Sequence, residues 1–290
     1  MRRVSALLGL LILLAVPAAQ AQSPDVALRL TYRTYAAGFT TVALTVGTDL
    51  GAGGYRLSLD YHTLGMIGLL FPGHAAVSAA GLWESDTARP HKFESEGTWS
   101  GRRYDVLIDY SDGTPLLRRI TPSQANRREP VPTALREGTI DTVSAMALLL
   151  HRMADGEGCD LGIRVFDGRR LMALQSSPAG TEELGVTARS FFHGPAMRCD
   201  VTGKTLAGFL RSDDAAERQR MSHGSVWFAH PVQGMPLLPV RMAFRTRWFG
   251  MATMYLTNVE SAAPADVSPL SSEMAQAPAG PAHRKASADR

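Results

Sequence analysis

Most of this chain alternates between apolar and polar residues with a period of two, which is the pattern of a β-strand with one buried face. The clearest segments are 26–35, 55–62, 104–110 and 238–248. Glycine-containing turns separate neighbouring segments, so consecutive strands are expected to pair antiparallel. The pattern therefore predicts a mainly β fold with about ten antiparallel strands.

The segment 141–153 has helical periodicity instead. Its apolar residues recur at intervals of three and four: Val143, Met146, Ala147, Leu150 and Met153. Asp141 is expected to cap the amino end of the helix, and Gly156 and Gly158 end it. His151 lies near the carboxyl end, and we interpret it as a rim or capping group rather than a catalytic base. We predict a single curved antiparallel sheet, or an open barrel, packed around this one main α-helix.

The segment 65–73, GMIGLLFPG, interrupts the alternation between two predicted strands. Its large apolar residues are Met66, Ile67, Leu69, Leu70 and Phe71. An apolar loop of this kind more often packs on the core as a plug than lies on the surface. If the loop is exposed, it would form a lip beside a ligand site or touch a membrane.

The amino terminus has the three parts of a secretory signal peptide. Arg2 and Arg3 precede an apolar run over residues 4–16, and small residues stand at Ala19 and Ala21. We expect cleavage after Ala21 and export to the periplasm. The alternative is a membrane anchor, which is disfavoured because the run is shorter than the roughly 20 residues that span a bilayer.

Removal of residues 1–21 changes the charge balance of the chain. It leaves 269 of the 290 residues and lowers the formal net charge from +3 to +1, so the composition does not indicate nucleic acid as a partner. About 240 residues can bury a sizeable core. We predict a single β-rich domain over residues 22–260 and a disordered tail rich in alanine, proline and serine over residues 261–290.

The chain contains two cysteines, Cys159 and Cys199. An oxidising periplasm favours joining them in a disulfide. A redox role is disfavoured because neither cysteine belongs to a C-x-x-C motif or has a nearby activating His or Lys in sequence. We therefore expect this pair to be structural.

Catalytic and metal-binding signatures are missing from the sequence. The eight histidines include no His-x-His pair and no H-E-x-x-H helix, and no G-x-S-x-G elbow is present. Glu94 and Glu96 share one face of a predicted strand, which we interpret as a solvated face rather than a catalytic pair. We expect no metal, no cofactor and no enzymatic activity.

Residues 118–136 form a basic stretch that carries five arginines and three prolines. The prolines keep the backbone extended, and connectors of this kind usually lie on the surface. The alternative is that these arginines contact an anionic headgroup or a glycan.

The assembled segments resemble a bacterial exported family known as domain of unknown function 3108 (DUF3108). The resemblance rests on YRTYAAG, YRLSLDYHTLGMIGLLFPG, REPVP, GTIDTVSAMALLL, CDLGIRVFDGRR and LPVRMAFRT. It covers roughly residues 27–260, and its specificity comes from the combination of these strings. The resemblance implies a periplasmic, mostly antiparallel β protein with no assigned activity.

Two hypotheses about function compete, and a third is weaker. The first is a non-enzymatic binder or carrier whose concave face holds an apolar, lipid-like ligand, with segment 65–73 as its lip. The second is an envelope scaffold whose barrel is filled by its own side chains and which binds another protein. The third is a hydrolase without a recognisable motif. The sequence leaves the oligomeric state open.

Overall fold

The computed structural model describes residues 27–246 and 250–263, and in this part of the chain 13 strands form one antiparallel sheet. The prediction of a mainly β fold is confirmed. The first seven strands are β1 (Leu28–Ala36), β2 (Phe39–Gly51), β3 (Gly54–Thr63), β4 (Gly73–Glu84), β5 (Thr87–Trp99), β6 (Arg102–Ser111) and β7 (Thr114–Thr121). The other six are β8 (Leu161–Phe166), β9 (Leu171–Leu184), β10 (Gly194–Ala207), β11 (Met221–Ala229), β12 (Leu238–Arg245) and β13 (Met251–Ser261).

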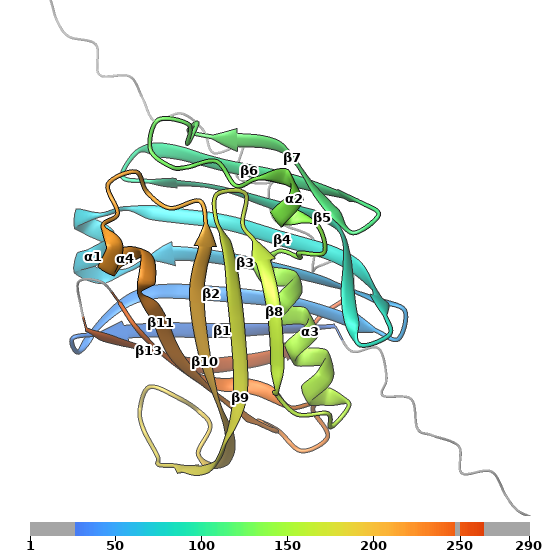
Figure 1. The fold of residues 1–290 in the computed structure, drawn as a ribbon. Helices are drawn as coiled ribbons and strands as arrows, with labels where there is room; N and C mark the ends of the chain where they lie inside the picture. The colour runs from blue at the N-terminus through green and yellow to red at the C-terminus, as the bar shows by residue number, and fades with distance from the viewer. Residues whose placement is uncertain (1–26, 247–249, 264–290) are drawn as a thin grey trace, which may run out of the picture.

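The first and last strands lie side by side in the middle of the sheet. The strand order is β7-β6-β5-β4-β3-β2-β1-β13-β12-β11-β10-β9-β8, and every neighbouring pair is antiparallel. From the β1–β13 pair the sheet curls in both directions, so that β8, β9 and β10 lie in front of β1 to β4 in Figure 1. The result is a nearly closed barrel with β7 and β8 as its two edges.

The connection between β7 and the longest helix covers part of the gap between the two edges. Ile140 forms a parallel bridge with Val165 of β8, and Arg128 forms an antiparallel bridge with Leu210. The amide of Gly138 donates to the carbonyl of Gly113 in the turn between β6 and β7, at 3.2 Å. Edge β8 is therefore partly paired, although it has no neighbouring strand on that side.

Four helices accompany the sheet in the described residues: α1 (Gly65–Leu70), α2 (Thr133–Arg136), α3 (Thr142–Ala154) and α4 (Ala215–Gln219). The longest, α3, packs against β3, β4, β5 and β8. Its buried apolar residues, with Leu57, Phe93 and Ile108 from the sheet, belong to one hydrophobic core. The predicted capping of this helix by Asp141 is also observed.

The predicted count of about ten strands around one main helix does not match the structure. The described residues contain 13 strands and four helices. One reason is β7, whose sequence TPLLRRIT has no regular alternation because its two arginines are consecutive. The expected basic connector over residues 118–136 thus begins as the last four residues of a strand.

The interpretation of segment 65–73 as a plug is wrong. Its residues 65–70 form α1, and none of them is buried. The helix that packs in the core is α3, whose buried apolar residues belong to one core cluster. The predicted signal peptide, with cleavage after Ala21, and residues 264–290 of the predicted tail lie outside the described residues. Within the described residues, no helix is long and apolar enough to cross a membrane.

Candidate ligand-binding cavity

The short helix α1 is anchored at both ends to the strands that flank it. The amide of Leu64 donates to the carbonyl of Thr41 at 2.8 Å. The hydroxyl of Thr63 accepts from the amide of Gly73 at 2.9 Å and donates to the carbonyl of Phe71 at 3.1 Å. A Cβ at Gly68 would lie 2.7 Å from the Thr63 carbonyl oxygen, so glycine is needed for this close approach.

The predicted lip residues divide into two groups. Ile67 lines a cavity beneath α1. The other four point largely to solvent, with exposed fractions of 62 % for Met66, 82 % for Leu69, 60 % for Leu70 and 46 % for Phe71. These four large apolar side chains, three on α1 and one on its C-cap residue Phe71, form an exposed apolar patch, which is a feature typical of interaction sites.

The cavity beneath α1 has a volume of about 410 Å³. Its apolar wall is built from several strands as well as the helix: Leu44 of β2, Leu59 of β3, Trp99 of β5, Phe244 of β12, Met254 of β13 and Ile67 of α1. Its size lies within the range of about 300–1,000 Å³ that is usual for small-molecule pockets.

Strand register brings these residues to the same side of the sheet. Thr34 of β1 pairs with Met254 on one side and with Val42 on the other. Met254 pairs in turn with Met242 of β12. Because side chains directly opposite one another in paired strands point to the same face, this row lines the concave side. The sequence pattern placed Leu59 and Phe244 on predicted strands but not in one cavity, because no local pattern specifies which strands pair or in which register.

One buried hydroxyl in this cavity has no hydrogen-bond partner. Thr34 is 4 % exposed, its Oγ1 atom is unpartnered, and its side chain lines the cavity. An unsatisfied buried hydroxyl costs about 1–3 kcal/mol. The hydroxyl oxygen is enclosed by protein atoms, so it is not open to a ligand in the cavity. Tyr61, another lining residue, has its pKa raised by burial and by the nearby Tyr104, so its phenol is protonated at neutral pH.

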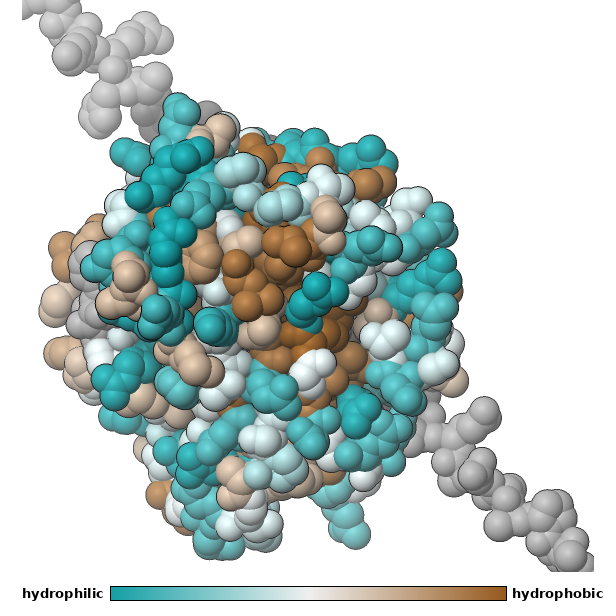
Figure 2. Space-filling model, in the orientation of Figure 1, coloured by the Kyte–Doolittle hydropathy of each residue, from teal (hydrophilic) through white to brown (hydrophobic). Residues whose placement is uncertain are grey.

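The apolar space continues along the inner face of β12 in two further cavities. A neighbouring cavity of about 260 Å³ is lined by both Phe244 and Met242. A third, of about 200 Å³, lies between α3 and strands β8 to β12, and Met242 and Met146 line it. Figure 2 shows an apolar area near the middle of the side that faces the viewer, where β8 and α3 lie in Figure 1. The concave interior is therefore not completely filled by side chains.

A buried hydrogen-bond network fixes the amino end of α3. The carboxylate of Asp141 accepts from the amides of Val143 and Ser144 and from the Ser144 hydroxyl at 2.6 Å. Tyr110 donates to the same carboxylate at 3.3 Å, and Tyr55 donates to the Ser144 hydroxyl at 2.7 Å. Burial raises the pKa of Asp141 although these donors oppose the shift. The network joins the helix cap to β3 and β6.

His151 lies at the other end of α3. Its ring stacks on Trp83 at 4.1 Å between ring centres, and its Nε2 atom is 3.3 Å from the Asp155 carboxylate. Trp83 in turn packs against Tyr55 of the Asp141 network, with 4.7 Å between ring centres. The place of His151 at the rim agrees with the interpretation from the sequence.

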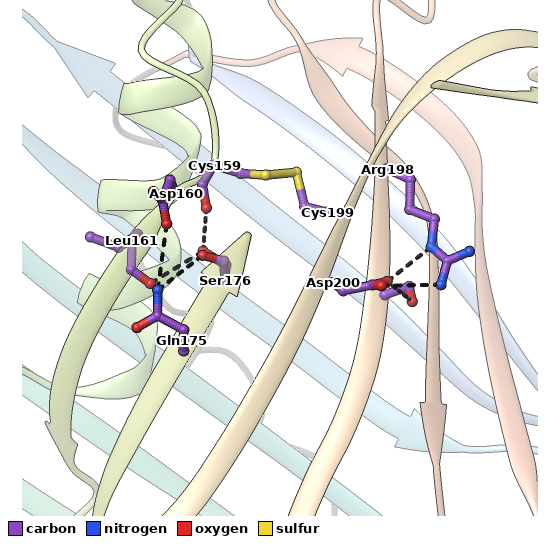
Figure 3. Close-up of a disulfide and its surroundings, with 9 residues drawn as sticks. Cys159, Asp160, Leu161, Gln175, Ser176, Arg198, Cys199 and Asp200 are labelled. Atoms are coloured by element: carbon purple, nitrogen blue, oxygen red, sulfur yellow. Dashed lines mark hydrogen bonds and ion pairs between the residues drawn. A yellow bond between two sulfur atoms is a disulfide. The ribbon is translucent and has the colours of Figure 1, made fainter. Parts of the chain in front are cut away.

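The predicted disulfide is present between Cys159 and Cys199, both of which are completely buried. Figure 3 shows that it joins the segment after α3 to β10. The hydroxyl of Ser176 on β9 donates to the carbonyl of Cys159 at 2.6 Å. The bond therefore fastens the exit of α3 to the sheet beyond the β8–β9 hairpin.

Glu94 and Glu96, the acidic residues that resemble a catalytic pair in the sequence, each form an ion pair with a basic side chain. Glu94 contacts Lys92 at 2.8 Å, and Glu96 contacts Arg103 at 3.9 Å. Among the residues that the structure describes, no group of three or more His, Cys, Asp or Glu side chains is placed to hold a metal ion.

Comparison with known proteins identifies a family. No curated protein matches the chain. A crystal structure of a beta-barrel-like protein of the domain of unknown function DUF1849 from Brucella abortus is 10 % identical, with a TM-score of 0.49 over 82 % of this chain and 98 % of that one. A "putative lipoprotein" from Parabacteroides distasonis is 8 % identical, with a TM-score of 0.32 over 82 % and 96 % of the two chains. The model of the protein family of unknown function DUF3108 matches residues 28–257, most of the chain, and this protein therefore belongs to that family.

Proposed function

We propose that this protein is an exported, non-catalytic binder of an apolar, lipid-like ligand in the cell envelope. The observation that carries the proposal is the apolar cavity of about 410 Å³ beneath α1. It lies directly beside a helix whose Met66, Leu69 and Leu70 are exposed. An acyl chain in the cavity would bury apolar surface that is now in contact with water, which is favourable by roughly 25 cal/mol per Å².

The lining of the cavity refines the chemistry of this ligand. Its wall consists mainly of apolar side chains, among them Leu44, Leu59 and Met254. The part of the ligand inside the cavity is therefore a hydrocarbon chain, as in acyl lipids.

Export is supported by the expected signal peptide and by the disulfide. Structural disulfides are common in secreted proteins and rare in the cytosol. We place the protein in the periplasm on these grounds. The non-catalytic part of the proposal rests on the sequence, which contains no recognised catalytic motif. It would be overturned by measurable enzymatic turnover that is lost when one polar residue is replaced.

Native mass spectrometry of the protein purified from its own periplasm tests both parts of the proposal. We expect a chain mass that lacks residues 1–21 and an accompanying lipid-sized mass. The variant Ala252→Leu adds three carbon atoms to the cavity wall and is expected to lose the accompanying mass while keeping the processed chain. A wild-type protein without any lipid-sized mass would reject the carrier proposal in favour of the envelope scaffold.

A further inference from the structure

A second pocket lies beside the connection between β7 and α3, near the gap in the barrel. It has a volume of about 350 Å³ and includes apolar residues of β7 and β8. Four arginines from three separate segments line it: Arg128, Arg136, Arg169 and Arg211. We call it the arginine pocket. It shares no lining residue with the cavity beneath α1.

None of these four arginines is within ion-pair distance of a carboxylate among the described residues. Each donates to a main-chain carbonyl instead, and the pairs are Arg128 with Gly208 (2.8 Å), Arg136 with Val131 (2.5 Å), Arg169 with Thr121 (3.4 Å) and Arg211 with Ala125 (3.2 Å). A guanidinium group has five N–H donors. At most two nitrogen atoms of each group are engaged in these contacts, so donors remain for a ligand.

The acidic groups around the arginine pocket are engaged elsewhere. Glu129 is the acidic residue in its wall, and Arg218 binds both carboxylate oxygens, at 2.6 and 3.2 Å. Asp167 lies next to the pocket, and its carboxylate contacts Arg170 at 2.8 Å. Asp167 also attracts Arg128 and Arg169, and Asp213 attracts Arg128, but neither carboxylate is within ion-pair distance of these arginines. Within the described residues, the four lining arginines therefore carry positive charge that no ion pair neutralises.

Three of the four arginines are half-buried, and burial lowers the pKa of Arg128, Arg136 and Arg169. Cations removed from water without a counter-ion are unfavourable. Two of them are held by aromatic rings, with Arg136 5.0 Å above Phe166 and Arg169 5.9 Å above Tyr104. Such contacts position a guanidinium but leave its charge available to an anion.

We propose that the arginine pocket binds a phosphate group. Planar guanidinium groups pair bidentately with phosphate oxygens. A tetrahedral anion with several acceptor oxygens can engage guanidinium groups that approach from different directions, which a single carboxylate does less well. The phosphate belongs either to free phosphate or to the headgroup of an anionic phospholipid. This assignment is independent of the apolar cavity and of the function proposed for it.

Isothermal titration calorimetry with inorganic phosphate tests the assignment, with the full chain in phosphate-free buffer at constant ionic strength. We expect saturable binding that weakens at least about tenfold in Arg128→Gln and Arg169→Gln, which corresponds to one lost charge-assisted hydrogen bond of about 1.4 kcal/mol. Arg118→Gln is the matched control, because Arg118 lies outside the pocket on β7 and pairs with Asp109 at 2.9 Å. Its affinity should equal that of the wild type.

A second arm separates the two sources of phosphate. Vesicles of phosphatidylcholine with or without phosphatidylglycerol are sedimented with the wild type and the same variants. Binding only to the anionic vesicles, lost in Arg128→Gln but not in Arg118→Gln, would assign the pocket to a lipid headgroup. If the half-buried variants fail to fold, Arg211→Gln replaces them, because Arg211 is exposed. The proposal is overturned if neither probe binds, or if the pocket variants bind as the wild type does.

Discussion

The indole ring of Trp99 lies directly against Gly73 on the adjacent strand. The two residues are paired between β4 and β5, and a Cβ atom at position 73 would come within 2.4 Å of the ring. Because Trp99 forms part of the cavity wall, the missing side chain at Gly73 determines where that wall stands.

Replacing Gly73 with alanine should therefore reshape the cavity. Overpacking costs about 1–3 kcal/mol, and we expect the affinity for an apolar fluorescent probe to fall about tenfold, with a change in tryptophan emission. Gly53→Ala is the matched control, since nothing lies within 4 Å of the Cβ that it adds. Equal probe affinity in the two variants would show that the Trp99 wall does not bound the binding site.

The exposed face of α1 should act in ligand exchange rather than in folding. Leu69 is 82 % exposed, so Leu69→Glu is expected to change the free energy of unfolding by less than about 0.5 kcal/mol. The same change should slow the transfer of a fluorescent fatty acid from vesicles, because a charge opposes contact with a membrane surface. The control variant is Val186→Glu, at a position that is 85 % exposed in the β9–β10 connection. It should accept the fatty acid from vesicles at the wild-type rate. If Leu69→Glu also transfers at that rate, α1 is not the lip.

The disulfide should contribute a large part of the stability. Its cysteines are separated by 40 residues in sequence, and closing a loop of this length stabilises the folded state by about 4 kcal/mol in the chain-entropy model. We expect Cys159→Ser combined with Cys199→Ser to lower the free energy of unfolding in urea by about 2–5 kcal/mol. A loss below about 1 kcal/mol would mean that the connection through Ser176 and the α3 packing holds this region without the bond.

The Asp141 carboxylate should be essential for placing α3. Asp141→Ala removes the helix cap, worth about 0.5–2 kcal/mol, and leaves the Ser144 and Tyr110 hydroxyls without their acceptor, at about 1–3 kcal/mol each. We expect a total loss of at least about 2.5 kcal/mol in equilibrium unfolding. Asp155→Ala, at the exposed end of the same helix, should cost less than about 1 kcal/mol.

The pH dependence of the same site has a definite sign. Burial raises the pKa of Asp141 above its ordinary value of 3.8, so the folded state binds the proton more tightly than the unfolded state does. This contribution is fully present below pH 3.8 and is lost as the pH rises through the folded-state pKa. Asp141→Asn cannot titrate, so its stability relative to the wild type should increase over this pH range. A relative stability that falls as the pH rises would show that the donors around Asp141 outweigh its burial.

The local features of this protein could be predicted from its sequence. The alternation in β1, β3, β6 and β12 identified strands because each residue's face is set by a period of two. The cap at Asp141 and the bond between Cys159 and Cys199 were predicted as well, since a capping residue acts on the next turn and a chain with two cysteines allows one pairing. These features need no knowledge of the neighbouring strand, which is why a single sequence was sufficient.

The cavity and the arginine pocket were decided by the tertiary structure. The GMIGLLFPG segment is apolar enough for a core position, yet its helix α1 has no buried residue and lies over a cavity. Thr34, Trp99 and Met254 meet because of register across strands that are far apart in the chain. Arg128 and Arg169 likewise converge only when the barrel closes. Composition and the period of the apolar residues determined the kind of fold. Long-range strand pairing determined which side chains line a cavity and which arginines lack a carboxylate at ion-pair distance.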